Sequence, residues 1–198
     1  MQFYQEITLL PDVNLSPYFL WTKVYTQLHL AFVEQQDDDG KIAYGVAFPQ
    51  YRLKPEKQIG FLGFKVRVFA QTEAELQALN LAKWLERLTD YVHITSIRPV
   101  PVDKVTGFSH YYRVIPKMSL DERIVHQAAR HDVSVDAARE HLKGYQTQAT
   151  IEPYIQLKSQ STGHNFALHI GKQSADGLGD GKFGAYGLSR SAGVPEFG

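Results

Sequence analysis

The chain has 198 residues, of which 21 are Lys or Arg and 21 are Asp or Glu, so it lacks the basic excess that is common in nucleic-acid-binding proteins. It contains no cysteine, which excludes disulfides, zinc–thiolate sites and iron–sulfur clusters, while its 43% hydrophobic residues predict a folded chain with a proper core. No apolar run reaches the roughly 18 residues of a membrane span and no basic stretch precedes the first apolar residues, so we expect a cytoplasmic protein that does not enter a membrane.

The chain begins with a predicted strand followed by a long helix. Residues 3–10 are rich in strand-forming side chains and end at a proline. Ser16 followed by Pro17 is typical of a helix start, with a capping side chain before a proline at the first helical position. We expect this helix to run to about residue 36, because its apolar side chains recur at the helical period.

Two further strands, a helix and a last strand follow. Residues 41–51 and 60–70 alternate between apolar and polar side chains, as strands do. Thr72 and the glutamate three residues later form a capping box for a helix to about residue 91, and residues 93–101 are a strand ended by prolines. The order β-α-β-β-α-β predicts an α+β fold in which residues 1–98 form a ferredoxin-like domain.

The second part of the chain, residues 104–198, has a different pattern. Residues 107–117 predict a strand or an extended arm, and Ser119 and Ser134 each cap a helix. Two apolar runs on either side of "SQSTG" (159–163) predict a pair of strands, and the glycine-rich tail after them predicts hairpin turns. We expect this part to be a second α/β domain.

The eight histidines are the first candidates for chemistry, because the imidazole titrates near neutral pH. His29 lies on the first predicted helix, where a packed structural histidine and a catalytic histidine are both open interpretations. The pairs His126/His131 and His164/His169 are each five residues apart, which separates their side chains on a helix or a strand. We therefore expect no metal site and no cofactor.

The helix that begins after Ser119 carries polar side chains on one continuous face, at spacings of three and four residues. Such a face can simply be solvated, or it can bind a polyanion, since Arg binds phosphate through two parallel hydrogen bonds. The residues of this face are Arg123, His126, Gln127 and Arg130.

The polar loop 159–163 raises a similar pair of alternatives. Most loops of Ser, Thr and Gly are only connections, but hydroxyls and backbone N–H groups in one turn can also bind a phosphate. Phe166, directly after the loop, could stack on a nucleic-acid base.

Five segments, taken in order, resemble the CRISPR repeat-processing endoribonuclease of the type I-F system. The last two are the most specific, and the resemblance spans nearly the whole chain. The segments are "ITLLPD" (7–12), "LHLAFV" (28–33), "GVAFP" (45–49), "SQSTGHNF" (159–166) and "YGLS" (186–189).

The resemblance implies a site built from distant parts of the chain. His29 would be the catalytic histidine and Ser159 its partner, with Tyr186 beside His29. Ser161 and Thr162 would line the scissile phosphate, together with the backbone of the loop up to Gly163. Phe166 would stack on a base of an RNA hairpin, and Arg113 would read a base. The helix face of Arg123, His126, Gln127 and Arg130 would lie in the major groove of the hairpin.

The function that the resemblance implies is cleavage of CRISPR repeat RNA at the base of a hairpin. The nucleophile would be the RNA's own 2′-hydroxyl, so no metal is required, and the products would be a 2′,3′-cyclic phosphate and a 5′-hydroxyl. The protein would then stay bound to the hairpin of the guide RNA and join other subunits of a surveillance complex. The alternatives are a non-catalytic subunit that only caps the hairpin and a ferredoxin-like domain unrelated to RNA.

Overall fold

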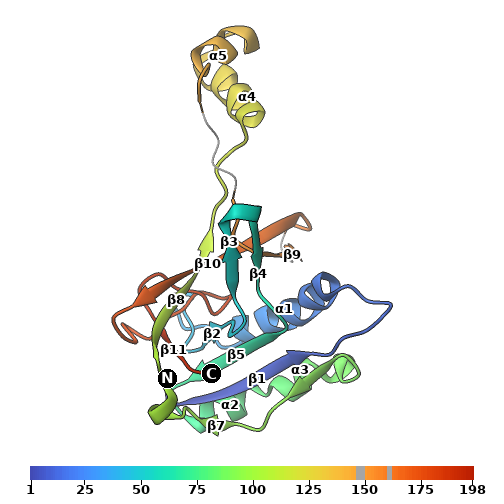
Figure 1. The fold of residues 1–198 in the computed structure, drawn as a ribbon, viewed down its shortest axis with the longest axis vertical. Coiled ribbons are helices and arrows are strands. Elements are labelled where there is room, and N and C mark those ends of the chain that lie inside the picture. Colours follow the sequence, from blue (N-terminus) through green and yellow to red (C-terminus); the bar gives the residue numbers. More distant parts are fainter. Residues whose placement is uncertain (146–149, 160–161) are drawn as a thin grey trace.

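A computed structural model describes residues 1–145, 150–159 and 162–198 of the chain (Figure 1). The fold is mixed α/β with several antiparallel sheets, and a pair of short helices projects from one end of the molecule. The two larger sheets belong to the first and second parts of the chain, and helix α1 (Pro17–Val33) packs against strands of both.

The sheet of the first part is antiparallel throughout. Its central strand β1 (Phe3–Leu9) lies between β5 (Lys65–Ala70) and β6 (Val92–Ile94), and β2 (Gly45–Ala47) pairs with the outer edge of β5. A short strand β7 (Arg98–Pro99) also pairs with β1. The strands of this sheet and the helices between them thus follow the expected order of strand, helix, two strands, helix and strand.

Helix α1 starts as the sequence predicts. The Ser16 side chain accepts a hydrogen bond from the Tyr18 N–H, and Pro17 occupies the first turn. The helix ends at Val33, earlier than expected, and a turn follows in which the Asp37 carboxylate accepts from the Lys41 N–H. Its buried side chains are those of the predicted apolar stripe and three aromatic rings: Leu20, Trp21, Val24, Tyr25, Leu28, Ala31 and Phe32.

The helix expected between residues 72 and 91 is interrupted. It forms α2 (Glu73–Leu79), α3 (Leu81–Trp84) and a 3-10 turn (Glu86–Leu88). Asn80 causes the break, because its φ of 48° lies in the left-handed region that Asn tolerates, and its side chain accepts from the Lys83 N–H. The break turns α3 so that it packs against α1.

The two strands expected within residues 41–70 are also shorter than predicted, and a hairpin lies between them. It consists of β3 (Arg52–Lys54) and β4 (Ile59–Phe61). Residues before β2 pair instead with the glycine-rich tail: Ile42 and Phe183 exchange two backbone hydrogen bonds of 3.0 Å. This pairing brings the end of the chain back to the first sheet.

The second sheet has the order β11-β8-β10-β9, all antiparallel. Its strands are β8 (Gly107–Val114), β9 (Tyr154–Lys158), β10 (Asn165–Ala175) and β11 (Val194–Glu196). The predicted strands on either side of the polar loop are therefore confirmed, and β9 packs against α1.

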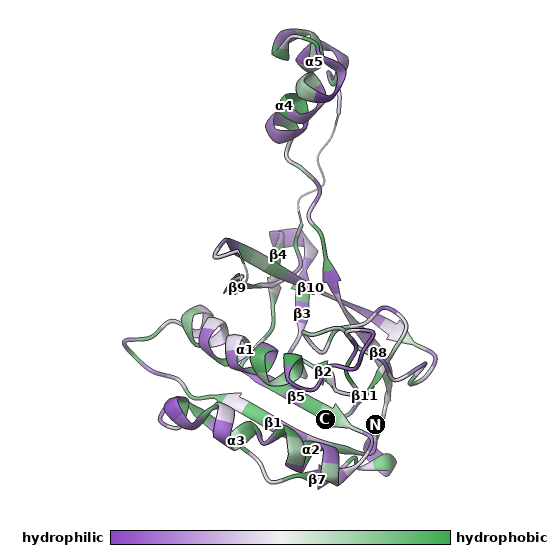
Figure 2. Cartoon of the chain, turned by 180° about the vertical axis from the view of Figure 1, so that it is seen from behind, coloured by the Kyte–Doolittle hydropathy of each residue, from purple (hydrophilic) through white to green (hydrophobic). Residues whose placement is uncertain are grey.

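Buried side chains of both sheets and of α1 form one hydrophobic cluster, which includes Ile7 and Val68 of the first sheet and Leu168 and Ile170 of the second. In Figure 2 the strands β1 and β5 are mainly hydrophobic, whereas much of the projecting helix pair is hydrophilic. That pair, α4 (Leu120–His131) and α5 (Val135–His141), has a small cluster of its own: Ile124, Ala128, Ala138 and Leu142.

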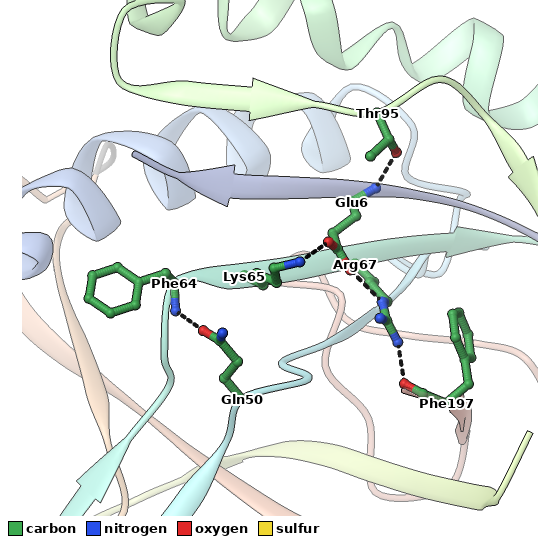
Figure 3. A network of polar contacts seen from close by, with 7 residues as sticks. All are labelled: Glu6, Gln50, Phe64, Lys65, Arg67, Thr95 and Phe197. Carbon is green, nitrogen blue, oxygen red and sulfur yellow. Dashed lines mark hydrogen bonds and ion pairs between the residues drawn. The ribbon is translucent and has the colours of Figure 1, made fainter. Parts of the chain in front are cut away.

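A buried ion pair attaches the end of the chain to the first sheet (Figure 3). Glu6 of β1 accepts hydrogen bonds from Lys65 at 2.6 Å and from the Arg67 Nε at 2.8 Å. Arg67 also donates to the Phe197 carbonyl at 2.7 Å and lies 4.0 Å from the centre of its ring. Burial alone would raise the pKa of Glu6, but the hydrogen bonds and charges of Lys65 and Arg67 outweigh it and lower that pKa.

Candidate active site

The half-buried imidazole of His29 lies on α1 and is held by the glycine-rich tail. Its Nδ1 lies 2.9 Å from the Ala185 carbonyl oxygen, and its ring stacks on Tyr186 with 4.2 Å between ring centres and 15° between the planes. A carbonyl can only accept a hydrogen bond, so Nδ1 must carry the proton. In the neutral ring, Nε2 therefore has the lone pair and can act as a proton acceptor.

Two hydrogen bonds position the tail segment around Tyr186. The hydroxyl of the fully buried Tyr25, four residues before His29, donates to the Tyr186 carbonyl at 2.8 Å, and the Val46 N–H donates to the Gly187 carbonyl at 3.0 Å. Gly187 has a φ of 69°, and a Cβ there would lie 2.6 Å from Val46 Cγ1, so only glycine fits. The contact between His29 and the tail thus depends on α1 and β2 together.

Phe166 and Arg113 extend this cluster. The Phe166 ring lies 6.4 Å from Tyr186 at 71°, and the Arg113 guanidinium lies 5.4 Å from the centre of the Phe166 ring. Burial raises the pKa of the Tyr186 hydroxyl and the charge of Arg113 partly offsets the rise, so this phenol is neutral at physiological pH. The structure therefore brings His29, Tyr186, Phe166 and Arg113 into one continuous row of contacts.

After β9, three hydrogen bonds connect Ser159 with residues 162–164. The Thr162 N–H donates to Ser159 Oγ at 3.2 Å and the Gly163 N–H to the Ser159 carbonyl at 2.9 Å. The Ser159 N–H donates to the His164 carbonyl at 2.8 Å. These three N–H groups already have acceptors in the turn, so a phosphate here has to displace such bonds or take its donors from side chains. Ser161 lies outside the described residues.

Strand pairing places this turn near the row of aromatic rings. Phe166 of β10 is opposite Leu157 of β9, and Leu157 is two residues before Ser159 in the chain. Strand β9 packs along α1. Ser159 therefore lies at the end of the strand that lines the His29 helix.

The polar face of α4 lines a surface pocket of about 400 Å³, to which Arg123, His126, Gln127 and Arg130 all contribute. The Arg123 guanidinium lies 4.4 Å from the centre of the Tyr145 ring and donates to its hydroxyl at 2.9 Å. The other three side chains have no hydrogen bond or ion pair with another described residue. Figure 1 shows α4 projecting away from α1, so this face is separate from the His29 cluster.

Sequence reasoning missed a second set of cations beside the site. A pocket of about 370 Å³ is lined by Arg113 and Tyr186 and also by Lys41 and Arg190. The Arg190 guanidinium lies 3.9 Å from the centre of the Tyr112 ring. The tail that carries Arg190 has no periodic pattern from which a site could be predicted. The one signal in the sequence was the position of Arg190 directly after the segment "YGLS".

Neither a metal site nor a membrane-spanning helix is present among the residues that the structure describes. No group of three or more His, Asp or Glu side chains in this part of the chain lies close enough together to hold a metal ion. Among the same residues, no helix has both the length and the apolar character needed to cross a membrane.

Comparison with known proteins gives matches over the whole chain. Residues 4–197 match the family model described as "CRISPR-associated protein (Cas_Csy4)". A protein of Pseudomonas aeruginosa (strain UCBPP-PA14) and one of Escherichia coli (strain UTI89 / UPEC), both named "CRISPR-associated endonuclease Cas6/Csy4", are 32% identical over 198 residues and 30% identical over 200 residues, with full coverage of both chains in each case. Among solved structures, "An RAMP protein binding different RNA substrates" aligns over 98% of this chain and 99% of its own, at 12% identity and a TM-score of 0.36.

Proposed function

The chain belongs to the Cas_Csy4 family of CRISPR-associated proteins, as its sequence segments predicted, and on that premise we propose that it is the endoribonuclease that cleaves CRISPR repeat RNA at the base of a hairpin. The observation that carries the proposal is the geometry of His29. A histidine that donates from Nδ1 to a backbone carbonyl and stacks on a tyrosine has a fixed orientation and a lone pair on Nε2, as a general base needs.

The proposed reaction is transesterification within the RNA. Neutral His29 accepts the proton of the 2′-hydroxyl through Nε2 while the 2′-oxygen attacks the adjacent phosphorus. The bond from phosphorus to the 5′-oxygen breaks, the leaving oxygen takes up a proton, and a 2′,3′-cyclic phosphate and a 5′-hydroxyl result. The Ser159 hydroxyl holds the 2′-oxygen in line, because positioning is a large part of the rate of such a step. The reaction requires neither a metal ion nor a cofactor.

The same cluster provides contacts for the base of the hairpin. Phe166 offers a face for a base, supported by Arg113, and the hydroxyl of Thr162 and the backbone up to Gly163 border the scissile phosphate. In this proposal residues 1–98 carry the catalytic histidine and residues 104–198 bind the RNA. The face of α4 lies along the hairpin stem, where Arg123, His126, Gln127 and Arg130 contact phosphates and bases.

The proposal includes what happens after cleavage. The protein stays on the hairpin of the guide RNA and associates there with other subunits of a CRISPR complex. A protein that only capped the hairpin would use the same binding residues, so the deciding property is cleavage by the purified chain.

The test is incubation of the purified protein with repeat RNA in excess EDTA, followed by separation of the products on a gel. We expect cleavage at the base of the hairpin, and His29→Ala should slow it by about a hundredfold or more while hairpin binding persists. His93→Ala, which changes an exposed histidine of β6, is the matched control and should cleave normally. A deoxyribose at the nucleotide before the scissile phosphate should stop cleavage.

Each arm can contradict a different part of the proposal. Binding without cleavage by the unaltered protein would favour the hairpin-capping subunit. Normal cleavage of the deoxy substrate would require water as nucleophile, and loss of activity in EDTA that magnesium restores would require a metal. Full activity of His29→Ala would remove the general base from the mechanism.

A further inference from the structure

A polar groove lies between α1 and α3, on the side of α1 next to His29. Its volume is about 610 Å³, and we refer to it as the α1–α3 groove. The side chains that define it come from α1, from α3 with the turn that follows, and from the end of β9: Lys23, Thr26, Lys83, Trp84, Arg87 and Lys158. None of these residues has a part in the mechanism described above.

The α1–α3 groove carries an excess of positive charge. Its walls include the four cations Lys23, Lys83, Arg87 and Lys158 against the two carboxylates of Glu34 and Glu86. Lys23, Lys83 and Arg87 are exposed, and none of them forms an ion pair with another described residue. In a chain with 21 basic and 21 acidic residues, this local excess is the pattern expected of a site for a polyanion.

The groove also offers a stacking surface and hydrogen-bonding groups. The indole of Trp84 is half-buried in the wall, with one part packed against the core. Thr26 donates its hydroxyl proton to the Thr22 carbonyl, so its oxygen remains an acceptor for a ribose hydroxyl or a base N–H. Cations along a channel together with an aromatic ring are the features that bind single-stranded nucleic acid without strict sequence preference.

The position of the groove connects it to the candidate active site. Lys158 immediately precedes Ser159, and Thr26 lies one helical turn before His29 on α1. In both Figure 1 and Figure 2, α3 lies at the opposite end of the molecule from α4 and α5, with α1 between them. An RNA whose stem lies on α4 and whose scissile phosphate lies at His29 therefore has its unpaired continuation directed towards α3.

From these observations we propose that the α1–α3 groove binds the single-stranded RNA that adjoins the base of the hairpin. The proposal rests on the proposed function, because that function puts the hairpin base at His29. The strand can be the segment upstream of the hairpin or the segment downstream of the cleaved bond. Both present the same chemistry to the groove, namely successive phosphates and unstacked bases.

The test measures binding by His29→Ala protein to three RNAs: the bare hairpin, the hairpin with an upstream oligouridine flank and the hairpin with a downstream one. We expect one flank to tighten binding and to steepen its salt dependence. Substitution of Lys23, Lys83 and Arg87 by Ala in the His29→Ala protein should remove the gain in affinity that the flank provides. It should also reduce the slope of log K against log salt by about 2, since each of the three single-strand phosphate contacts contributes about 0.7. Binding of the bare hairpin should not change.

The matched control replaces two exposed lysines outside the groove, Lys57→Ala and Lys104→Ala, and should keep the full effect of the flank. A gain from the upstream flank or from the downstream flank supports the proposal and identifies the strand. The proposal is overturned if neither flank changes affinity or slope, or if the triple variant keeps the whole gain. If the triple variant binds RNA as before but no longer assembles with other CRISPR proteins, the proposal is also overturned, and the groove binds a protein partner instead.

Failure of the groove proposal can be distinguished from failure of the proposed function. Cleavage of the bare hairpin by protein with His29 intact tests that function. Normal cleavage without any effect of a flank defeats only the groove, whereas no cleavage and no hairpin binding defeats the function.

Discussion

Tyr25→Phe removes one hydrogen bond and little else. The Tyr25 ring is fully buried on α1, and its hydroxyl donates to the Tyr186 carbonyl at 2.8 Å. Phenylalanine keeps the ring and its stacking on Phe48, whose ring centre lies 6.1 Å away. The change leaves the Tyr186 carbonyl without its donor, next to the Ala185 carbonyl that orients His29.

The expected cost follows from this geometry. A buried acceptor that loses its donor lowers the free energy of unfolding by about 1–3 kcal/mol. If about 1 kcal/mol of that cost loosens the tail around His29, cleavage slows about fivefold, because 1.4 kcal/mol corresponds to tenfold in rate. Affinity for the hairpin should stay close to that of the unaltered protein, since neither Tyr25 nor Ala185 contacts the proposed stem-binding face.

Urea unfolding followed by circular dichroism measures the stability, and single-turnover cleavage at saturating protein measures the rate. Tyr18→Phe is the matched control, because Tyr18 is 64% exposed on the same helix and loss of its hydroxyl should change stability by less than about 0.5 kcal/mol. Equal stabilities and equal rates of Tyr25→Phe and Tyr18→Phe would refute the reasoning that this hydroxyl positions the tail.

Three further changes test other parts of the structure. Arg67→Met should lower the free energy of unfolding by about 1.5–3 kcal/mol in urea titrations, because Glu6 loses a charged hydrogen bond but keeps Lys65 as a partner. The pKa of Glu6 is lowered in the folded state. Its contribution to stability is therefore complete above the unfolded pKa of about 4.3 and is lost as pH falls through the lower folded pKa. The difference in stability between Arg67→Met and the unaltered protein should accordingly shrink in acid. Arg130→Ala should reduce the salt slope of hairpin binding by about one. The control Arg139→Ala, on α5 and outside the α4 pocket, should leave the slope unchanged. Equal slopes for the two variants would show that the α4 face is solvated and does not contact the hairpin. Gly187→Ala should lower the melting temperature and the cleavage rate together, because a Cβ at its positive φ meets Val46, and a fully stable variant would show that the tail can shift.

Local signals in the sequence predicted the helix starts well. Ser16, Thr72, Ser119 and Ser134 each cap a helix in the structure, and Thr72 and Ser119 form complete capping boxes. These motifs involve residues at most three positions apart, so the sequence alone contains both partners. The break at Asn80 was missed because a left-handed asparagine inside a helical pattern leaves the apolar spacing almost unchanged.

Features that depend on distant partners were not predictable in the same way. Residues 41–51 alternate like a strand, but Ile42 pairs with Phe183 of the tail, and β2 is only three residues long. The cations Lys41 and Arg190 meet in one pocket because of this pairing. Neither residue belongs to a periodic segment or a motif that would have joined them.

The candidate site shows the same division. Periodicity placed His29 on a helix, but nothing in the spacing of the chain distinguished it from a packed histidine. Its contact with Tyr186, 157 positions away, was expected from the resemblance to a family, and the structure has these two rings stacked. The amide groups of Ser159, Thr162 and Gly163 were expected to be available to a phosphate, whereas the turn already uses them.

The small cluster that holds α4 to α5 has a consequence for how this protein can diversify. Ile124, Ala128, Ala138 and Leu142 pack against one another, while the buried residues around His29 belong to the larger cluster of the two sheets. Replacement of outward-facing side chains on α4 therefore leaves both clusters and the His29–Tyr186 contact intact. Under the proposed function, a change in the repeat can therefore be matched by substitutions on α4 alone, and grafting the α4–α5 pair of one relative onto another should redirect cleavage to a new hairpin.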